Sequence, residues 1–394
     1  SRTLTASPAA GTGTVTLQAT ASGFAAGASK LVVNLNGGGS VAFGSGGFFT
    51  SPGADMVLGS DSALAEVEFR NPIDLAATPH TFTVVDNTST GTDFATISGN
   101  LSNGTDITVS ASGTALQLLG ANTYTGTTTV SAGILVVNSL GSSASPAGTG
   151  TSLGLSGAGV TFGSTNALLL GNAGTTAGIL QYVGPGETSD RLIQLRTTTG
   201  SVQILADGTG PLVLTNLQNS WTAGSKTLYL RGSNTQANTI SSVLADFVSG
   251  TDTLSLIIDG GATWVLTGAN TYTGTTSVSL NTSYSTFTGG ALGLGADNCL
   301  GTGTLQIRSG SVFAVGGDRV IANPLANGIS TISCTACFFG DYSLTFSGAN
   351  TMINTTVSHT ITNNIVAGKT LTFTGPMTWN AITSAKTLTV NGAG

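Results

Sequence analysis

The nine-residue segment GANTYTGTT occurs twice in this chain, at residues 120–128 and 268–276, without a single substitution. It contains no His, Cys, Asp, Glu, Lys or Arg, so it lacks the side chains that most often transfer protons or bind metals. It combines glycine, asparagine and β-branched threonine, which favour turns and short strands. An internal repeat of this kind is typical of proteins built from stacked structural units.

Weaker repeats extend this pattern. SGANTMINTTVS at 347–358 and RGSNTQANTIS at 231–241 resemble the nine-residue segment, and an arginine precedes an apolar strand in EFRNPIDL (68–75), DRLIQL (190–195) and DRVIANPL (318–325). These segments predict three degenerate super-repeats, at about 68–140, 190–290 and 318–394. Residues 1–60 contain no such copy, and we expect them to form a β-rich N-terminal segment that starts or caps a solenoid formed by residues 61–394.

Most of the remaining sequence alternates apolar and polar residues over four to six positions, as half-buried β-strands do. Nine such stretches are KLVVNLNG, HTFTVVDN, TDITVSAS, GILVVNSL, KTLYLRGS, DTLSLIID, SLTFSGAN, KTLTFTGP and KTLTVNGA. The best amphipathic candidate for a helix, ISSVLADFVSG at 240–250, is short enough to be an excursion from a sheet. The pattern predicts an all-β stack with about 20–25 residues per coil.

The composition excludes several classes of protein. Charged residues are 7% of the chain, against roughly 25% in ordinary globular proteins, and the net charge is −6. The 11 Lys and Arg residues are scattered singly, so we expect no nucleic-acid partner. No apolar run is long enough for a transmembrane helix. The start, SRTLTASPAA, lacks the pattern of a signal peptide, so an exported protein would already have lost its signal.

The segment LTGANTYTGTTSVS at 266–279 resembles the autotransporter-associated β-strand repeat, which occurs in passenger domains of secreted bacterial proteins. Residues 119–131 match it nearly as well and are followed by AGILVV. With the arginine strands, the resemblance covers about half of the chain. It implies an elongated, right-handed parallel β-helix with a few excursion loops, located outside the cell or at its surface.

We expect the repeated segment to have a structural role. The motif residues are Gly120, Asn122, Tyr124 and Gly126 in the first copy and Gly268, Asn270, Tyr272 and Gly274 in the second. The glycines are expected to permit backbone angles closed to other residues, and the asparagines to bond the local backbone in Asx-turns. The tyrosines are expected to cover a corner, with their hydroxyls in water. The alternative is a platform on which the tyrosines stack sugars.

Other candidates for chemistry are few. Cys334 and Cys337 form a Cys-x-x-Cys pair, for which a small disulfide loop or buried thiols are favoured over a redox motif because the flanking sequence indicates strands. A zinc site is disfavoured because a fourth soft ligand is missing. The densest acidic group is Asp55, Asp61, Glu66 and Glu68, with Arg70 nearby. Glu66, Glu68 and Arg70 would share one face of a strand, which suits either a catalytic or Ca²⁺ site or a solvated ion-pair face; we expect no enzyme and no cofactor.

Three functions fit these patterns. The sequence starts and stops within β-like stretches, and uncapped solenoid ends can add strands from another copy. We therefore expect a structural protein that assembles head to tail with copies of itself into a fibre, sheath or surface layer. The alternative is a monomeric autotransporter-passenger adhesin, with host or matrix glycans as partners. A β-helix polysaccharide lyase or hydrolase is the third hypothesis.

Overall fold

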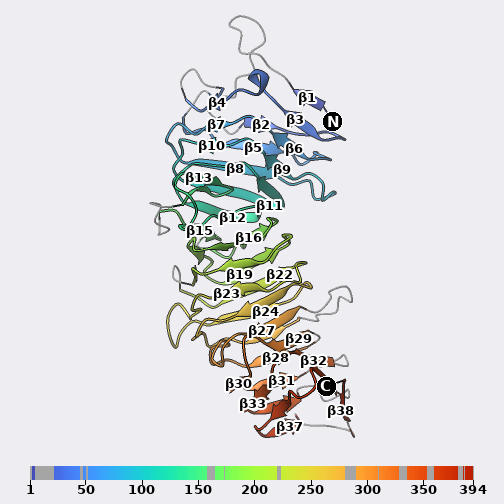
Figure 1. The fold of residues 1–394 in the computed structure, drawn as a ribbon. Helices are drawn as coiled ribbons and strands as arrows, with labels where there is room; N and C mark the ends of the chain where they lie inside the picture. The colour runs from blue at the N-terminus through green and yellow to red at the C-terminus, as the bar shows by residue number, and fades with distance from the viewer. Residues whose placement is uncertain are drawn as a thin grey trace, which may run out of the picture. The chain divides into compact units, whose positions relative to one another are not determined.

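The computed structural model describes residues 2–4, 22–44, 48–49, 52–157, 165–172, 174–219, 223–279, 290–308, 310–327, 335–352, 359–379, 385 and 387–393. Within them there is no α-helix; the helical segment is a 3-10 turn, η1 (Asn36–Gly38). The chain divides into two compact units, Ser1–Thr197 and Thr198–Gly394. In each unit, short parallel strands stack one above another in successive coils (Figure 1).

The first unit winds through three parallel sheets, which the chain visits in the order I, III, II. Sheet I consists of β1 (Arg2–Leu4), β3 (Leu31–Val33), β6 (Val67–Phe69), β9 (Ala95–Ile97), the second halves of β11 (Ile107–Leu118) and β12 (Thr128–Val137), and β16 (Gly178–Tyr182). Sheet II consists of β2 (Ser22–Phe24), β5 (Met56–Gly59), β8 (His80–Val85), the first halves of β11 and β12, β15 (Leu168–Leu170) and β18 (Ile193–Leu195). Sheet III consists of β4 (Val41–Ala42), β7 (Ile73–Asp74) and β10 (Leu101–Ser102).

Two further elements of this unit lie outside the three sheets. An antiparallel hairpin of β13 (Thr149–Thr151) and β14 (Gly154–Ser156) is inserted between β12 and β15. The short strand β17 (Glu187–Ser189) lies between β16 and β18 in the chain. Among the described strands of the first 60 residues, β3, β4 and β5 pair with β6, β7 and β8, and β1 and β2 pair with β3 and β5. These strands therefore belong to the same stack as the later ones.

In the second unit the chain alternates between two long parallel sheets and, from residue 319, also visits a third. Sheet IV consists of β19 (Gly200–Ala206), β22 (Lys226–Gly232), β24 (Leu254–Ile258), β26 (Thr276–Val278), β28 (Leu305–Ile307), β31 (Leu325–Asn327), β34 (Asn350–Met352) and β37 (Met377–Trp379). Sheet V consists of β20 (Leu212–Leu214), β23 (Asn238–Ile240), β25 (Thr263–Leu266), β27 (Ala291–Leu294), β29 (Ser311–Ala314), β32 (Thr335–Gly340), β35 (His359–Ile365) and β38 (Leu388–Asn391). Sheet VI consists of β30 (Arg319–Ile321), β33 (Leu344–Phe346) and β36 (Leu371–Phe373).

The core of each unit is formed by alternate residues of the strands, which point into the coil. Leu228 and Leu256, for example, are register partners on adjacent strands, and both are fully buried. Each such side chain contributes about 1.5–3 kcal/mol through burial. Near the end of the second unit, Phe346 lies 5.4 Å from Phe338 and 5.6 Å from Phe373 between ring centroids, so aromatic rings continue the same interior.

The number of residues per coil covers a wider range than the expected 20–25. Register partners are 19 residues apart at Leu116 and Leu135, which face each other across β11 and β12. They are 45 residues apart at Leu135 and Leu180, because the hairpin lies in the intervening segment. Parallel pairing resumes after the insertion, since a loop at a corner does not disturb the strands on either side.

The all-β parallel solenoid predicted from the sequence is confirmed. All nine stretches with period-two alternation contain a strand, namely β3, β8, β11, β12, β22, β24, β33, β36 and β38. The amphipathic candidate at 240–250 is not helical: its first residue ends β23 and the rest is a loop. The three super-repeats, by contrast, stay a prediction, because the two compact units do not test their boundaries.

Candidate functional site: the asparagine–tyrosine corners

The two copies of GANTYTG form equivalent corners, which we call the Asn–Tyr corners (residues 120–126 and 268–274). The first connects β11 in sheet I to β12 in sheet II, and the second connects β25 in sheet V to β26 in sheet IV. Each corner therefore carries the chain from one sheet to the next within one coil. The same residues make the same kinds of contact in both copies.

The glycines of the corners are needed for close approach between coils. An added Cβ would lie 2.5 Å from the carbonyl oxygen of Gly99 at Gly120, and 2.2 Å from that of Ser242 at Gly268. None of the four motif glycines has a positive φ. The expectation of backbone angles reserved for glycine is therefore wrong. Glycine is needed here because the backbone of the preceding coil leaves no room for a side chain.

The asparagine of each corner joins its own coil to a segment before it and a segment after it in the chain. The Asn122 Oδ1 accepts a hydrogen bond from the Leu101 N–H at 2.8 Å, and its Nδ2 donates to the Ser152 carbonyl at 2.8 Å. In the second corner, Asn270 accepts from the Leu244 N–H at 2.7 Å and donates to the Cys299 carbonyl at 2.6 Å.

Both asparagine side chains are at least 95% buried, and neither residue has a positive φ. The bonds connect residues 21–30 positions apart, so the expected local Asx-turn is wrong. Because a buried peptide group must find a partner, these amides satisfy backbone groups where strand pairing stops at a corner.

The tyrosines of the corners are interior residues. Tyr124 is 1% and Tyr272 0% exposed, and their hydroxyls bond the hydroxyls of Thr128 at 2.7 Å and Thr276 at 2.6 Å. Burial raises the pKa of Tyr124 to about 12 and raises that of Tyr272 as well. The expected contact with water is wrong, because the threonine four residues later supplies a buried partner, and a ring this deeply buried cannot stack on a sugar.

The two weaker copies differ from these corners. The segment 231–241 leads into β23 of sheet V, whereas the second corner leads into sheet IV. In the segment 347–358, Gly348 keeps the close approach: an added Cβ would lie 2.2 Å from the Asn323 carbonyl oxygen. Residues 353–358 of this copy lie outside the described residues.

Asparagines that follow other strands also hydrogen-bond backbone groups of a preceding coil. The sequence analysis did not identify them as motif residues. Asn71 bonds the N–H and the carbonyl of Leu35 at 2.7 and 2.6 Å. Asn323 donates to the carbonyls of Gly301 and Gly303 at 3.1 and 2.8 Å. Both residues precede a proline, so the recurring Asn-Pro pair in EFRNPIDL and DRVIANPL was the signal that could have identified them.

The recurring Asp-Arg pairs hold backbone groups of neighbouring segments. Arg191 is 2% exposed, and its guanidinium donates to the carbonyls of Leu140 at 2.6 Å and Asn166 at 3.0 Å; burial lowers its pKa to about 10. Asp190 accepts from the Ser143 N–H at 2.8 Å. Arg319 likewise donates to the Val315 carbonyl at 2.5 Å. The guanidinium, with its five donors, replaces the strand pairing that these segments lack.

The acidic group is divided by the fold. Lys30 lies 2.9 Å from Glu66 and 2.8 Å from Glu68, and Arg70 bonds Glu68 at 2.8 Å. The Arg70 hydrogen bond is the main cause that lowers the pKa of Glu68 to about 2. A carboxyl with such a pKa stays ionised at neutral pH and cannot act as the protonated acid of a glycosidase.

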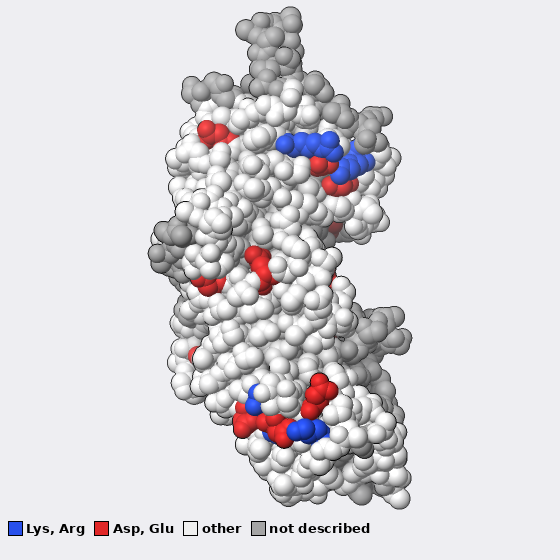
Figure 2. Space-filling model, viewed as in Figure 1, with Lys and Arg blue, Asp and Glu red and all other residues white. Residues whose placement is uncertain are grey.

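The other two acidic residues play separate parts. Asp55 accepts a hydrogen bond from the Thr81 N–H at 3.0 Å, and Asp61 is exposed. No group of three or more His, Cys, Asp or Glu side chains within the described ranges is placed to hold a metal ion. On the face shown in Figure 2, charged side chains form a few small groups on a surface that is otherwise uncharged.

Of the cysteines, Cys299 is fully buried, and burial raises the pKa of its thiol to about 11. Cys337 lies in β32, where its Sγ accepts a hydrogen bond from Asn364 at 3.7 Å. Cys334 lies outside the described residues, so the Cys334–Cys337 disulfide stays a prediction. No helix in the described part of the chain is long and apolar enough to cross a membrane.

Stacked parallel coils joined by repeated corners define a β-solenoid repeat protein. Residues 112–137 and 256–279, which contain the two Asn–Tyr corners, match the family model of the passenger-associated-transport-repeat. A stretch of 114 residues, 28% of this chain, is 39% identical to the adhesin BmaC autotransporter of Brucella suis biovar 1 (strain 1330). The chain therefore contains passenger-type repeats similar to those of autotransporter proteins, as the sequence resemblance implied.

The matched stretch covers 3% of the length of the Brucella adhesin, so this chain corresponds to a small part of that relative. No solved structure matches the chain. The passenger-type repeat implies a surface or secreted location.

Proposed function

We propose that this chain is a β-solenoid segment of a bacterial surface adhesin and that its role is binding rather than catalysis. The observation that carries the proposal is the presence of passenger-type repeats at the two Asn–Tyr corners, together with 39% identity over 114 residues to an autotransporter adhesin. At the corners the coils are held together by amides and hydroxyls, without charged side chains. A solenoid held in this way presents stable outer faces on which adhesive residues can vary.

The non-enzymatic part of the proposal is supported by the acidic group. Glu66 and Glu68 are both paired with Lys30, and Glu68 also with Arg70. Their remaining contacts are hydrogen bonds from Thr96 and Ser98. This network, in which the Glu68 residue is 8% exposed, supports an ion-pair face over a catalytic site.

The head-to-tail fibre stays a prediction. It was inferred from the ends of the sequence, and none of the similarities found supports assembly into a filament. The adhesin alternative agrees slightly better with the relative that the chain resembles.

Attachment of coated beads tests the proposal. Fluorescent beads carrying the purified chain at a fixed density are expected to attach to cell monolayers or to immobilised extracellular matrix in excess of beads carrying albumin. Soluble chain added in excess is expected to abolish the difference. Attachment equal to the albumin control at saturating coating density, on every surface tried, would refute the adhesive role.

A further inference from the structure

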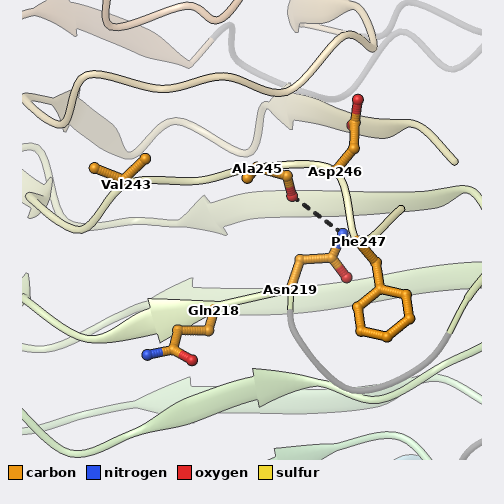
Figure 3. Close-up of a pocket in the computed structure, with 6 residues that line it drawn as sticks. All are labelled: Gln218, Asn219, Val243, Ala245, Asp246 and Phe247. Atoms are coloured by element: carbon orange, nitrogen blue, oxygen red, sulfur yellow. Dashed lines mark hydrogen bonds between the residues drawn. The ribbon is translucent and has the colours of Figure 1, made fainter. Parts of the chain in front are cut away.

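A hollow of about 290 Å³ lies on the second unit, between β21 (Leu217–Gln218) and the loop after β23. Figure 3 shows its lining, in which the two segments face each other across adjacent coils. The residues that line it are Gln218, Asn219, Val243, Ala245, Asp246 and Phe247. Its volume lies just below the usual range for small-molecule sites, about 300–1,000 Å³, so it suits a ligand the size of one ring.

The side chain of Asn219 gives the hollow a polar wall. Asn219 is 7% exposed; its Nδ2 donates to the Ala245 carbonyl at 3.3 Å, which is a long hydrogen bond. Its Oδ1 is buried and has no hydrogen-bond partner among the residues that the structure describes. In Figure 3 this oxygen is turned toward Phe247. An acceptor that is buried without a donor is unfavourable, and rotation of the amide about its soft terminal torsion would present the oxygen to a donor in the hollow.

The charged residue of the lining is the acidic Asp246, whose carboxylate is already hydrogen-bonded within the protein. Asp246 points away from the other lining residues in Figure 3, and its carboxylate accepts hydrogen bonds from the Leu254 N–H at 2.7 Å and from the Thr273 N–H and hydroxyl at 3.1 and 2.7 Å. The nearby cation, Lys226, is 2% exposed, donates to the Gly224 carbonyl and lies 5.8 Å from the Phe247 ring centroid. The hollow thus offers an acceptor and an aromatic ring, and no exposed cation for an anionic ligand.

We propose that this hollow binds a single neutral sugar residue of a glycan, an inference that rests on the adhesive function proposed above. A sugar hydroxyl would donate to the Asn219 Oδ1, and the C–H face of the ring would pack against Phe247, which lies next to Asn219 in Figure 3. Val243, at the other end of the lining in that view, is 53% exposed, so the hollow is open to solvent there. Acidic sugars are disfavoured, because the Asp246 carboxylate lies beside the hollow without a free cation to offset it.

Titration with simple glycosides tests the proposal. The probes are the methyl glycosides of glucose, galactose, mannose and their N-acetylamino forms, followed by saturation-transfer NMR on the full chain. At least one is expected to bind saturably with a Kd of about 1 mM, as a single ring buries little surface. Phe247→Leu, which keeps an apolar side chain but removes the flat ring, and Asn219→Leu, which removes the acceptor, are each expected to weaken binding about tenfold.

A matched control is Val320→Ala, because Val320 is also an exposed valine of the second unit (50%) but lies on β30, away from the hollow; it is expected to leave the affinity unchanged. Binding as tight in both hollow variants as in the wild type, no saturable binding by any neutral glycoside, or tighter binding of a uronic acid, sialic acid or peptide would overturn the proposal. Bead attachment that persists in the Phe247→Leu and Asn219→Leu variants would leave the adhesive function standing and reject this site alone.

Discussion

At Gly274 an added Cβ would lie 2.3 Å from the carbonyl oxygen of Leu254, and at Gly126 it would lie 2.1 Å from the carbonyl carbon of Thr105. In both cases the neighbour is backbone of another coil, so no side chain can move to make room. Single residues of the Asn–Tyr corners therefore set how closely two coils approach. Two substitutions measure this effect.

Gly274→Ala is expected to destabilise the second unit by about 1–3 kcal/mol, the usual cost of overpacking. The control is Gly91→Ala, where an added Cβ meets nothing within 4 Å and φ is not positive; it is expected to be neutral. Urea unfolding followed by circular dichroism compares the two. A neutral Gly274→Ala would show that the coils can separate at this corner without loss.

Tyr272→Phe leaves the buried Thr276 hydroxyl without its partner at 2.6 Å. We expect a loss of about 1–2 kcal/mol, the cost of an unmade buried hydrogen bond. Tyr124→Phe is expected to lose a similar amount in the first unit, because Thr128 is buried in the same way. A clear loss in one copy and none in the other would contradict the equivalence of the two corners.

At the scale of the strand, β6 carries the charged face of the first unit. Glu68 lies between Lys30 and Arg70, and its pKa is lowered from 4.5 to about 2. A lowered pKa in the folded state stabilises the fold above the unfolded value of 4.5, and this contribution is lost as the pH falls toward 2. Part of the acid sensitivity of the first unit should therefore come from this one carboxylate.

Glu68→Gln is expected to reduce the difference in urea midpoint between pH 6 and pH 3. The exposed Asp61→Asn, which also removes one negative charge, is expected to leave that difference unchanged. Equal pH dependence in the wild type and in Glu68→Gln would show that the Lys30–Glu68–Arg70 network does not stabilise the fold.

The loop that contains the β13–β14 hairpin is held by the segment around β17. Glu187 accepts hydrogen bonds from the N–H groups of Leu140 and Gly141 at 2.5 and 3.1 Å, and Arg191 holds the Leu140 carbonyl. Arg191→Lys keeps the charge but loses the planar fork of donors. We expect the free energy of unfolding to fall by about 2–4 kcal/mol and proteolysis within residues 142–147, measured by mass spectrometry, to become faster. The control is Arg70→Lys, because the Arg70 side chain is 53% exposed. Unchanged proteolysis would mean that the loop is held by other contacts.

The strands were predictable from the sequence because alternation is a local signal, as in KTLYLRGS, which forms β22. The contacts made by the corners could not be predicted from the sequence. Asn122 bonds Leu101 and Ser152, which lie 21 and 30 residues away, and coil length varies too much for a fixed period to identify such partners. The repeat correctly indicated a structural motif, but the burial of Tyr272 depends on coils above and below that a local pattern does not contain.

For the whole molecule, coils that contact mainly their neighbours predict that damage stays local. Gly126→Ala is expected to increase amide hydrogen exchange in β8, β11 and β12 and to leave β29 and β33 in the second unit as protected as in the wild type. Hydrogen-exchange mass spectrometry resolves these peptides. Uniform loss of protection across both units would instead indicate a single cooperative fold.

The hairpin of β13 and β14 has a consequence for how such a molecule can change. Forty-five residues separate Leu135 from its register partner Leu180, yet β12 and β16 pair over five consecutive positions as though nothing had been added. The corner after β12 is therefore a place where the chain can acquire or lose whole segments while the coil keeps its register. Foreign sequence, such as an antigen for display, should be tolerated best at the exposed residues 146–148 of that insertion.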